Sequence, residues 1–279
     1  MNIRMIVDST VDLMPEYRKR VKVVPLTVHF GDEEYIDGVT IDHKTFYRKL
    51  VETDVLPTTS QATPTAFADQ FRQAQKAREA CIVITLFSRL SGTYQSAVMA
   101  AQEYEHVYVV DSATVAVGSG ILTELAFRYM DQGLDAETVA AKIEEDKKKI
   151  VIVALVDTLE YLKKGGRLSK TVAFAGSMLN IKPVISVIDG EIHLLGKAMG
   201  SKRGNNLLVQ EIDKAGGVDF AKPALLGYTG LSDALLLKYI EDSKPLWENR
   251  LDQVRYATIG PVIGTHAGPG AVAVAFFKK

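Results

Sequence analysis

Short apolar runs rich in β-branched residues recur along the chain and alternate with amphipathic stretches. The runs have the length and composition of buried strands, and they read IRMIVD, CIVITLF, VYVVD, IVIVALV, PVISVI, ALLGYT and VAVAFF. Apolar residues at helical spacing fill most of the stretches between them. This alternation predicts an α/β fold.

The connections between the runs predict how the strands pair. The stretch SGTYQSAVMAAQEY, between the second and third runs, has room for one crossover helix, so we expect parallel strands in a right-handed βαβ unit. Two other segments predict β-hairpins, with turns at Gly31–Asp32 and Asp189–Gly190. Thr63 and Asp135 are candidate N-caps of helices.

The regular alternation of strand-like and helix-like segments changes near LEYLKKGGRLSK, and this change predicts that the chain divides into two domains. Residues 1–158 are expected to form a doubly wound α/β domain with a mainly parallel sheet. Residues 159–279 are expected to form an α/β domain with a mixed sheet, because a predicted hairpin interrupts the alternation there.

The amino-acid composition limits which binding partners and which cellular location we expect. The 279 residues include 33 Lys and Arg against 34 Asp and Glu, so no large electrostatic field favours nucleic acid. The single cysteine, Cys81, lies in an apolar run and excludes an intrachain disulfide framework. The first residues begin a strand-like run without the apolar stretch of a signal peptide, and we expect a cytoplasmic protein.

Polar residues follow several of the predicted parallel strands, at the sheet edge where α/β proteins bind ligands. Asp8 follows the first strand, Ser91 and Gly92 follow the second, and Asp111 follows the third. A hydroxyl beside a glycine at a helix start can cradle a carboxylate or an oxyanion. The alternative is that Ser91 only caps the helix.

Several common chemistries lack their motifs in this sequence. There is no G-x-x-x-x-G-K-[ST], no complete G-x-G-x-x-G, no G-x-S-x-G and no H-E-x-x-H. The segment DSTVD resembles the phosphatase motif D-x-D-x-T, but Thr10 replaces the second aspartate. The five histidines are scattered, which disfavours a metal site. His266, in GTHAGPG, is expected in a non-helical loop, either at a ligand or as a buried structural residue.

Eight segments, in order and spacing, resemble the DegV family across essentially the whole chain. They are IVDSTVDL, FGDEEYIDGVTI, PTTSQATP, LSGTYQSA, VVDSATVAVGSG, LEYLKKGGRL, IKPVI and IGTHAGPGAVAV. The resemblance implies a two-domain α/β protein with a tunnel between the domains that binds one long-chain fatty acid, without a cofactor or ATP site of its own. It further implies that the protein is not an enzyme by itself but the fatty-acid-binding subunit of a bacterial fatty acid kinase.

The resemblance also implies partners and site residues. The partner would be a kinase subunit similar to dihydroxyacetone kinases, which phosphorylates the presented carboxyl group for phospholipid synthesis, and the lipid would exchange transiently with membranes. The carboxylate-binding residues fall on Thr59 or Ser60, on Ser91 with Gly92, and on His266. Arg203 matches a segment that faces the kinase, although NNLL replaces the usual end of that motif.

The physical chemistry of a fatty acid agrees with such a site. Each buried methylene contributes about 0.8 kcal/mol, so sixteen carbons give at most roughly 12 kcal/mol before ordering costs. Hydroxyls and backbone N–H groups suffice to replace water around the carboxylate, so the site needs no full positive charge there. Phe174, Met178 and Leu179 suit a tunnel wall, or ordinary core packing.

Two other functions stay open at this point. One is a small-molecule phosphatase or hydrolase that uses Asp8, Ser91 and His266, although no nucleophile and base occur in a known spacing. The other is a regulatory protein that senses a lipid without passing it on.

Overall fold

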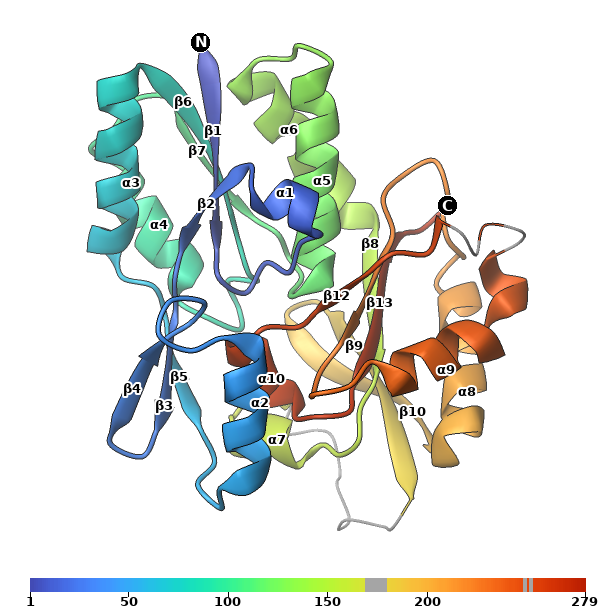
Figure 1. Cartoon of the computed structure of the whole chain (residues 1–279). Coiled ribbons are helices and arrows are strands. Elements are labelled where there is room, and N and C mark those ends of the chain that lie inside the picture. The colour runs from blue at the N-terminus through green and yellow to red at the C-terminus, as the bar shows by residue number, and fades with distance from the viewer. Residues whose placement is uncertain (169–179, 248–249, 251–252) are drawn as a thin grey trace.

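A computed structural model gives the fold of the chain and describes residues 1–168, 180–247, 250 and 253–279. It shows two lobes, each built on a sheet, and a small third sheet below the first (Figure 1). This is the two-domain α/β fold that the sequence predicts. Phe174, Met178 and Leu179 lie outside the described residues.

The first lobe contains a four-stranded parallel sheet in the order β2-β1-β6-β7. Its strands are β1 (Asn2–Asp8), β2 (Val21–Val24), β6 (Glu79–Thr85) and β7 (Val107–Asp111). Helices α3 (Pro64–Ala77) and α4 (Thr93–Ala101) cover one face, and α5 (Val117–Asp131) and α6 (Ala136–Asp146) cover the other (Figure 1). Alternate residues of β1 enter the two cores, Ile6 on one side and Met5 and Val7 on the other.

The third sheet belongs to the same lobe and is antiparallel, in the order β4-β3-β5. Its strands are β3 (Thr27–Phe30), β4 (Glu33–Ile36) and β5 (Thr58–Ser60). Helix α2 (His43–Glu52) runs between β4 and β5, and the short α1 (Pro15–Arg18) lies between β1 and β2.

The second lobe contains a six-stranded mixed sheet in the order β10-β9-β8-β13-β11-β12, parallel only between β11 and β12. Its strands are β8 (Ile150–Leu155), β9 (Ile181–Ile188), β10 (Glu191–Met199), β11 (Leu225–Tyr228), β12 (Tyr256–Thr258) and β13 (Val272–Phe277). Helices α8 (Gly200–Lys214) and α9 (Ala234–Asp242) cover its outer face (Figure 1). The short helices are α7 (Glu160–Lys164), α10 (Pro261–Ala267), η1 (Lys147–Lys149) and η2 (Lys244–Trp247).

Helix α5 lies between the two large sheets (Figure 1), and its residues 117–127 are all buried. Its residues Leu122 and Ala126 pack into the core of the parallel sheet. Ile121 and Leu125, on the opposite side, pack with Ile152 and other residues of the mixed sheet. One helix therefore belongs to the cores of both lobes.

The predicted elements agree well with the structure. All seven apolar runs are strands, both hairpins form, and the second and third runs flank α4 in a parallel βαβ unit. Thr63 Oγ1 accepts a hydrogen bond from the N–H of Ala66 at 3.3 Å, and Asp135 Oδ1 accepts one from Thr138 at 2.8 Å. Both predicted N-caps are confirmed.

One expectation is wrong, and one stays a prediction. The segment around His266 is not a loop but helix α10, because Pro261 begins it with a helical φ and Gly268 ends it. The division after residue 158 stays a prediction. The chain changes from the first large sheet to the second earlier, since β8 already pairs with β9 and β13.

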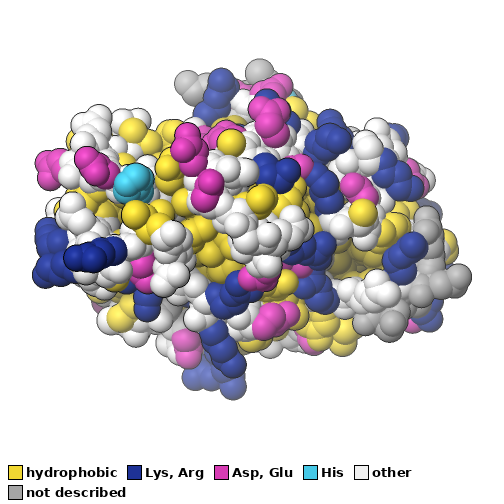
Figure 2. All heavy atoms as spheres, turned by 90° about the horizontal axis from the view of Figure 1, so that it is seen from above, with side chains coloured by type: hydrophobic (Ala, Val, Ile, Leu, Met, Phe, Trp, Pro, Cys, Tyr) yellow, Lys and Arg dark blue, Asp and Glu magenta, His cyan; other side chains and the backbone are white. Residues whose placement is uncertain are grey.

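The surface carries both signs of charge. Figure 2, which views the molecule from the upper end of Figure 1, shows Lys and Arg side chains interspersed with Asp and Glu side chains and with apolar atoms. This face carries no continuous basic stripe of the kind that binds nucleic acid.

Candidate ligand-binding site

A cavity of about 380 Å³ lies between the lobes, lined by residues of the third sheet, of the six-stranded sheet, of α10 and of the loops that follow β6 and β7. The second lobe supplies an apolar wall, whose residues include Ile152, Ala154 and Ala273. The polar residues at the cavity include Thr59, Ser60, Gln61, Ser91, Gly92, Arg167 and His266. Each carboxylate-binding residue proposed from the sequence thus lines one cavity.

His266 lies on α10, and its ring points toward the third sheet of the first lobe. Its Nε2 is 3.1 Å from Thr59 Oγ1, and its buried Nδ1 has no hydrogen-bond partner among the described residues. Burial disfavours the charged imidazolium and the nearby positive charge of Arg167 adds to this, so the pKa of His266 falls to about 4. The imidazole is therefore neutral at pH 7 and can donate one hydrogen bond.

The glycines around His266 allow close packing rather than a mobile loop. A Cβ at Gly264 would lie 2.3 Å from the hydroxyl oxygen of Tyr47, and one at Gly165 would lie 2.3 Å from His266 Nδ1. Asp12 Oδ1 accepts the N–H of Gly260 at 3.0 Å and so holds the start of α10. Gly165, from the KKGGR segment, thus makes room for the imidazole.

The two hydroxyls that the sequence left as alternatives point in different directions. Thr59 is half-buried and contacts His266, whereas Ser60 is exposed and its Oγ lies 2.8 Å from His29 Nε2. Residues at neighbouring positions of a strand face opposite sides, and β5 follows this rule. The geometry favours Thr59 over Ser60 as the hydroxyl beside His266.

Ser91 is placed by the start of α4. Its Oγ accepts the N–H of Thr93 at 3.3 Å and lies 3.0 Å from Thr93 Oγ1, so Ser91 helps to cap the helix while it lines the cavity. Gly92 allows the side chain of Gln61 to pack closely against the backbone, since a Cβ on Gly92 would lie 2.1 Å from Gln61 Oε1. Gln61 itself donates to Ser96 Oγ at 2.9 Å. Capping and cavity lining are compatible here.

Arg167 and Gln61 line the cavity but were not predicted as site residues. The Nε of Arg167 donates to the carbonyl oxygen of Leu90 at 3.2 Å, and its Nη1 donates to that of Gly165 at 2.7 Å. The guanidinium borders the cavity near His266, so a full positive charge lies at a site that, by the argument from the sequence, does not need one. In the sequence, the KKGGR segment belongs to the family pattern and to the predicted domain boundary, and neither of these predicts a cavity residue.

Asp8 does not line the cavity. Its Oδ1 accepts the N–H and the hydroxyl of Thr10 at 2.8 and 2.6 Å, and its Oδ2 accepts the N–H of Leu86 at 2.7 Å. Burial raises its pKa to about 6. These contacts tie the end of β1 to the end of β6 and leave neither carboxylate oxygen without a partner.

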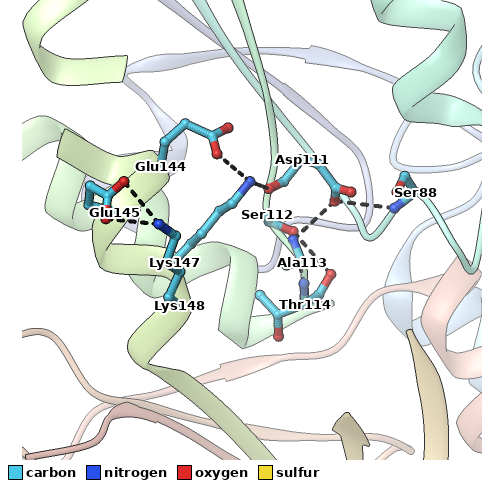
Figure 3. Close-up of polar contacts among 9 residues, drawn as sticks. All are labelled: Ser88, Asp111, Ser112, Ala113, Thr114, Glu144, Glu145, Lys147 and Lys148. Atoms are coloured by element: carbon cyan, nitrogen blue, oxygen red, sulfur yellow. Dashed lines mark hydrogen bonds and ion pairs between the residues drawn. The ribbon is translucent and has the colours of Figure 1, made fainter. Parts of the chain in front are cut away.

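Asp111 also braces loops beside the cavity (Figure 3). Its Oδ1 accepts the N–H groups of Ser88 and Ala113 at 3.2 and 3.0 Å, and its carbonyl oxygen accepts Lys147 Nζ at 2.8 Å. Lys147 in turn pairs with Glu144 at 2.6 Å. The cluster fixes the turn after β7 against the loop that leads to Ser91.

Arg203 lies away from the cavity, exposed on α8, and the structure gives it no hydrogen bond or ion pair to another described residue. Among the described residues, no group of three His, Cys, Asp or Glu side chains could hold a metal ion. Within the described ranges of the chain, no helix is both long and apolar enough to span a bilayer.

Comparison with known proteins gives consistent matches over the full length. A family model described as "Uncharacterised protein, DegV family" matches residues 2–279. A DegV domain-containing protein of Caldanaerobacter subterraneus is 34% identical, and one of Deinococcus radiodurans is 32% identical; each alignment covers 99% of this chain and at least 98% of the relative.

Solved structures with the same fold are described by their ligands. A DegV family protein from Thermus thermophilus, described as fatty acid binding, has a TM-score of 0.88 and 30% identity, and covers 99% of this chain and 100% of its own. A stearic acid-binding protein from Eubacterium ventriosum has a TM-score of 0.87 and 27% identity, with 100% and 99% covered. DegV from Bacillus subtilis, described as a fatty acid binding protein, has a TM-score of 0.83 and 29% identity, with both chains covered fully.

Proposed function

Because this chain belongs to the DegV family, we propose that it binds one long-chain fatty acid in the cavity between its lobes. The observation that carries the proposal is the cavity itself, with an apolar wall and with hydroxyl, imidazole and guanidinium groups among its lining. A fatty acid has matching portions, a hydrocarbon chain and one carboxylate. The similar proteins described as fatty-acid-binding support the same ligand class.

The carboxylate would be bound by Thr59, Ser91 and His266 with help from Arg167. The guanidinium supplies the only full positive charge among the described residues of the lining, and charge-assisted hydrogen bonds to carboxylates are stronger than neutral ones. The neutral imidazole adds a donor without a second charge. Two guanidinium nitrogens already donate to carbonyl oxygens, which holds the side chain in place before the ligand arrives.

The hydrocarbon chain would supply most of the affinity. Each methylene that leaves water contributes about 0.8 kcal/mol, whereas the head group exchanges water for protein partners at little net gain. The alanines of the second-lobe wall leave width for the chain. Binding should therefore weaken steeply as the fatty acid is shortened.

We further propose that the protein presents the carboxylate to a separate kinase subunit similar to dihydroxyacetone kinases, for acyl-phosphate formation. Support comes from the resemblance of the whole chain to the DegV family, from the absence of an ATP-binding motif in the sequence and from the exposure of Arg203 on α8. In this role the chain carries the substrate and needs no cofactor, and the lipid reaches it by transient exchange with a membrane.

The other functions are less well supported. A hydrolase that uses Asp8 would need a carboxylate free to act at the cavity, but both oxygens of Asp8 accept short hydrogen bonds outside it. A lipid-sensing regulator would have the same site as a carrier. Phosphoryl transfer to the bound lipid separates these two functions.

Native mass spectrometry of the protein purified from a bacterial host tests the proposal directly. We expect a mass increment equal to one long-chain fatty acid, and a smaller loaded fraction in a variant that joins Ser91→Ala with Arg167→Ala. A protein that carries no lipid and binds neither oleate nor palmitate would refute the ligand class. A loaded protein that accepts no phosphate from ATP with any kinase subunit of its host would refute only the carrier role.

A further inference from the structure

The turn of the β9–β10 hairpin packs against the first lobe. Asp189 and Gly190 form this turn, both with positive φ, at +49° and +85°. Asp189 is exposed at the tip, whereas Gly190 is buried although it lies in a two-residue turn. A side chain from the other lobe accounts for this burial.

That side chain is Arg89, from the loop between β6 and α4. A Cβ placed on Gly190 would lie 1.9 Å from Arg89 Cδ and 2.8 Å from Arg89 Cβ, so the stem of the arginine lies across the glycine. The guanidinium Nη1 then donates to the carbonyl oxygen of Asp189 at 2.8 Å. Only a glycine at this position leaves room for the arginine, and the left-handed φ independently favours glycine.

A second arginine makes the reverse contact beside the first. Arg167, from the second lobe, donates through Nε to the carbonyl oxygen of Leu90, the residue after Arg89, at 3.2 Å. Thus one arginine of each lobe donates a hydrogen bond to a backbone carbonyl oxygen of the other lobe. The two contacts bridge the same short stretch of the boundary between the lobes.

This stretch borders the cavity on both sides. Leu90 and Ser91, directly after Arg89, line it from the first lobe. Val187 and Ile192, on the two strands that lead into the turn, line it from the second lobe. If Arg89 moved away from the turn, these segments of the cavity wall would move apart.

We propose that Arg89 and the Asp189–Gly190 turn form a clasp whose opening controls how fast a ligand leaves the cavity between the lobes. The proposal rests on the proposed function only in that the ligand is a fatty acid. β10 is an edge strand of the six-stranded sheet, and its outer side makes only the isolated bridge between Ile192 and Leu168 among the described residues. Outward movement of the hairpin would break this bridge, but it would separate β10 from no strand other than β9. The clasp joins the free corner of this hairpin to the other lobe.

The chain offers a matched pair of glycines for the test. Gly190 and Gly133 have nearly the same left-handed φ, +85° and +84°, which alanine disfavours at both positions. A Cβ at Gly133 contacts nothing within 4 Å, whereas one at Gly190 displaces Arg89. Gly133→Ala therefore serves as the strain control for Gly190→Ala.

The measurement is the dissociation rate of cis-parinaric acid, a fluorescent fatty acid, from the delipidated protein after mixing with excess oleate. We expect Gly190→Ala to accelerate dissociation at least fivefold and Gly133→Ala less than twofold. Arg89→Ala should accelerate it similarly, and adding Gly190→Ala to Arg89→Ala should change it less than twofold further. Arg89→Met keeps an aliphatic side chain over Gly190 but removes the guanidinium that donates to Asp189. This variant therefore separates the effect of the hydrogen bond from the effect of the packing contact.

Hydrogen exchange of the ligand-free variants provides a second measurement that does not depend on the ligand. Amides of residues 185–192 should exchange faster in Gly190→Ala and Arg89→Ala than in Gly133→Ala. Wild-type rates in both measurements for these two variants would overturn the clasp. A wild-type protein that binds neither cis-parinaric acid nor oleate would overturn the proposed function instead, and with it the effect on ligand release. Should Gly190→Ala fail to fold, Arg89→Ala and Arg89→Met decide the matter.

Discussion

The candidate site works through side chains whose charge states are set by burial. His266 stays neutral because its imidazole is buried and lies near Arg167, so a carboxylate would meet one full positive charge rather than two. Two buried carboxyl groups of the first lobe, Asp12 and Asp37, show the converse effect, since burial raises the pKa of each. Each also keeps one buried oxygen without a hydrogen-bond partner among the described residues.

The charge state of His266 can be measured in the ligand-free protein. The pKa of about 4 lies below the ordinary value of 6.5, so the unfolded chain binds this proton more readily than the folded one. The stability contributed by the neutral ring therefore falls as the pH drops from about 6.5 to about 4. A proton NMR titration, with the signal assigned by its loss in His266→Gln, should give a pKa below 5. A titration midpoint near 6.5 would contradict the burial argument.

Asp37 should make the folded state less stable at high pH. Burial raises its pKa from 3.8 to about 7, so between these values the folded protein takes up a proton that the unfolded chain does not. Stability from this group falls as the pH rises through that window and then levels off. Asp37→Asn should thus be more stable than the wild type at pH 8, by about 1 kcal/mol or more.

Urea unfolding of the two proteins at pH 8 and pH 5 measures this difference. The gain from Asp37→Asn should shrink toward pH 5, where the wild-type carboxyl is already protonated in the folded state. A gain that is equal at both pH values, or a loss at pH 8, would show that the native carboxyl is ionised.

At the scale of elements, local patterns predicted most strands and several helices, while contacts between distant segments decided the rest. The apolar runs and caps are local signals, and the structure confirms them. Helix α10 was missed because its glycines look like loop residues, although Gly264 is required by its contact with Tyr47. The cavity positions of Arg167 and Gln61 depend on how the lobes meet, which no local pattern contains.

The neighbouring strands β8 and β13 form part of the cavity wall. Ala154 and Ala273 are directly paired across these strands, and both line the cavity. Ala154→Leu adds three carbon atoms to this wall, so it should weaken the binding of stearate at least tenfold and that of laurate by less than threefold. Displacement of cis-parinaric acid by each fatty acid gives both affinities. Ala154→Ser, which barely changes the volume, is the control, and an equal loss for both acids would place this wall outside the path of the chain.

At the scale of the whole molecule, α5 connects the two cores. A helix packed on its two sides by different sheets loses one set of contacts when either lobe unfolds, so each lobe stabilises the other. We therefore expect one cooperative transition rather than two. The single tryptophan, Trp247, is buried in the second lobe and reports on that lobe alone.

Two probes followed during urea unfolding test this expectation. Tryptophan fluorescence reports on the second lobe, and far-ultraviolet circular dichroism reports on helices and strands of both. The two curves should coincide, with one midpoint. Separate midpoints would show that the lobes unfold independently despite the shared helix.

The position of α5 also limits where the protein can be truncated. A fragment that ends before β8, residues 1–149, would keep the parallel sheet but leave Ile121 and Leu125 facing solvent along a bare stripe. Such a fragment should be poorly soluble alone, and its solubility should recover when the remainder, residues 150–279, is co-expressed with it. Engineered versions of this protein should therefore keep the full-length chain, because a cut at the boundary between the lobes exposes the apolar side of α5.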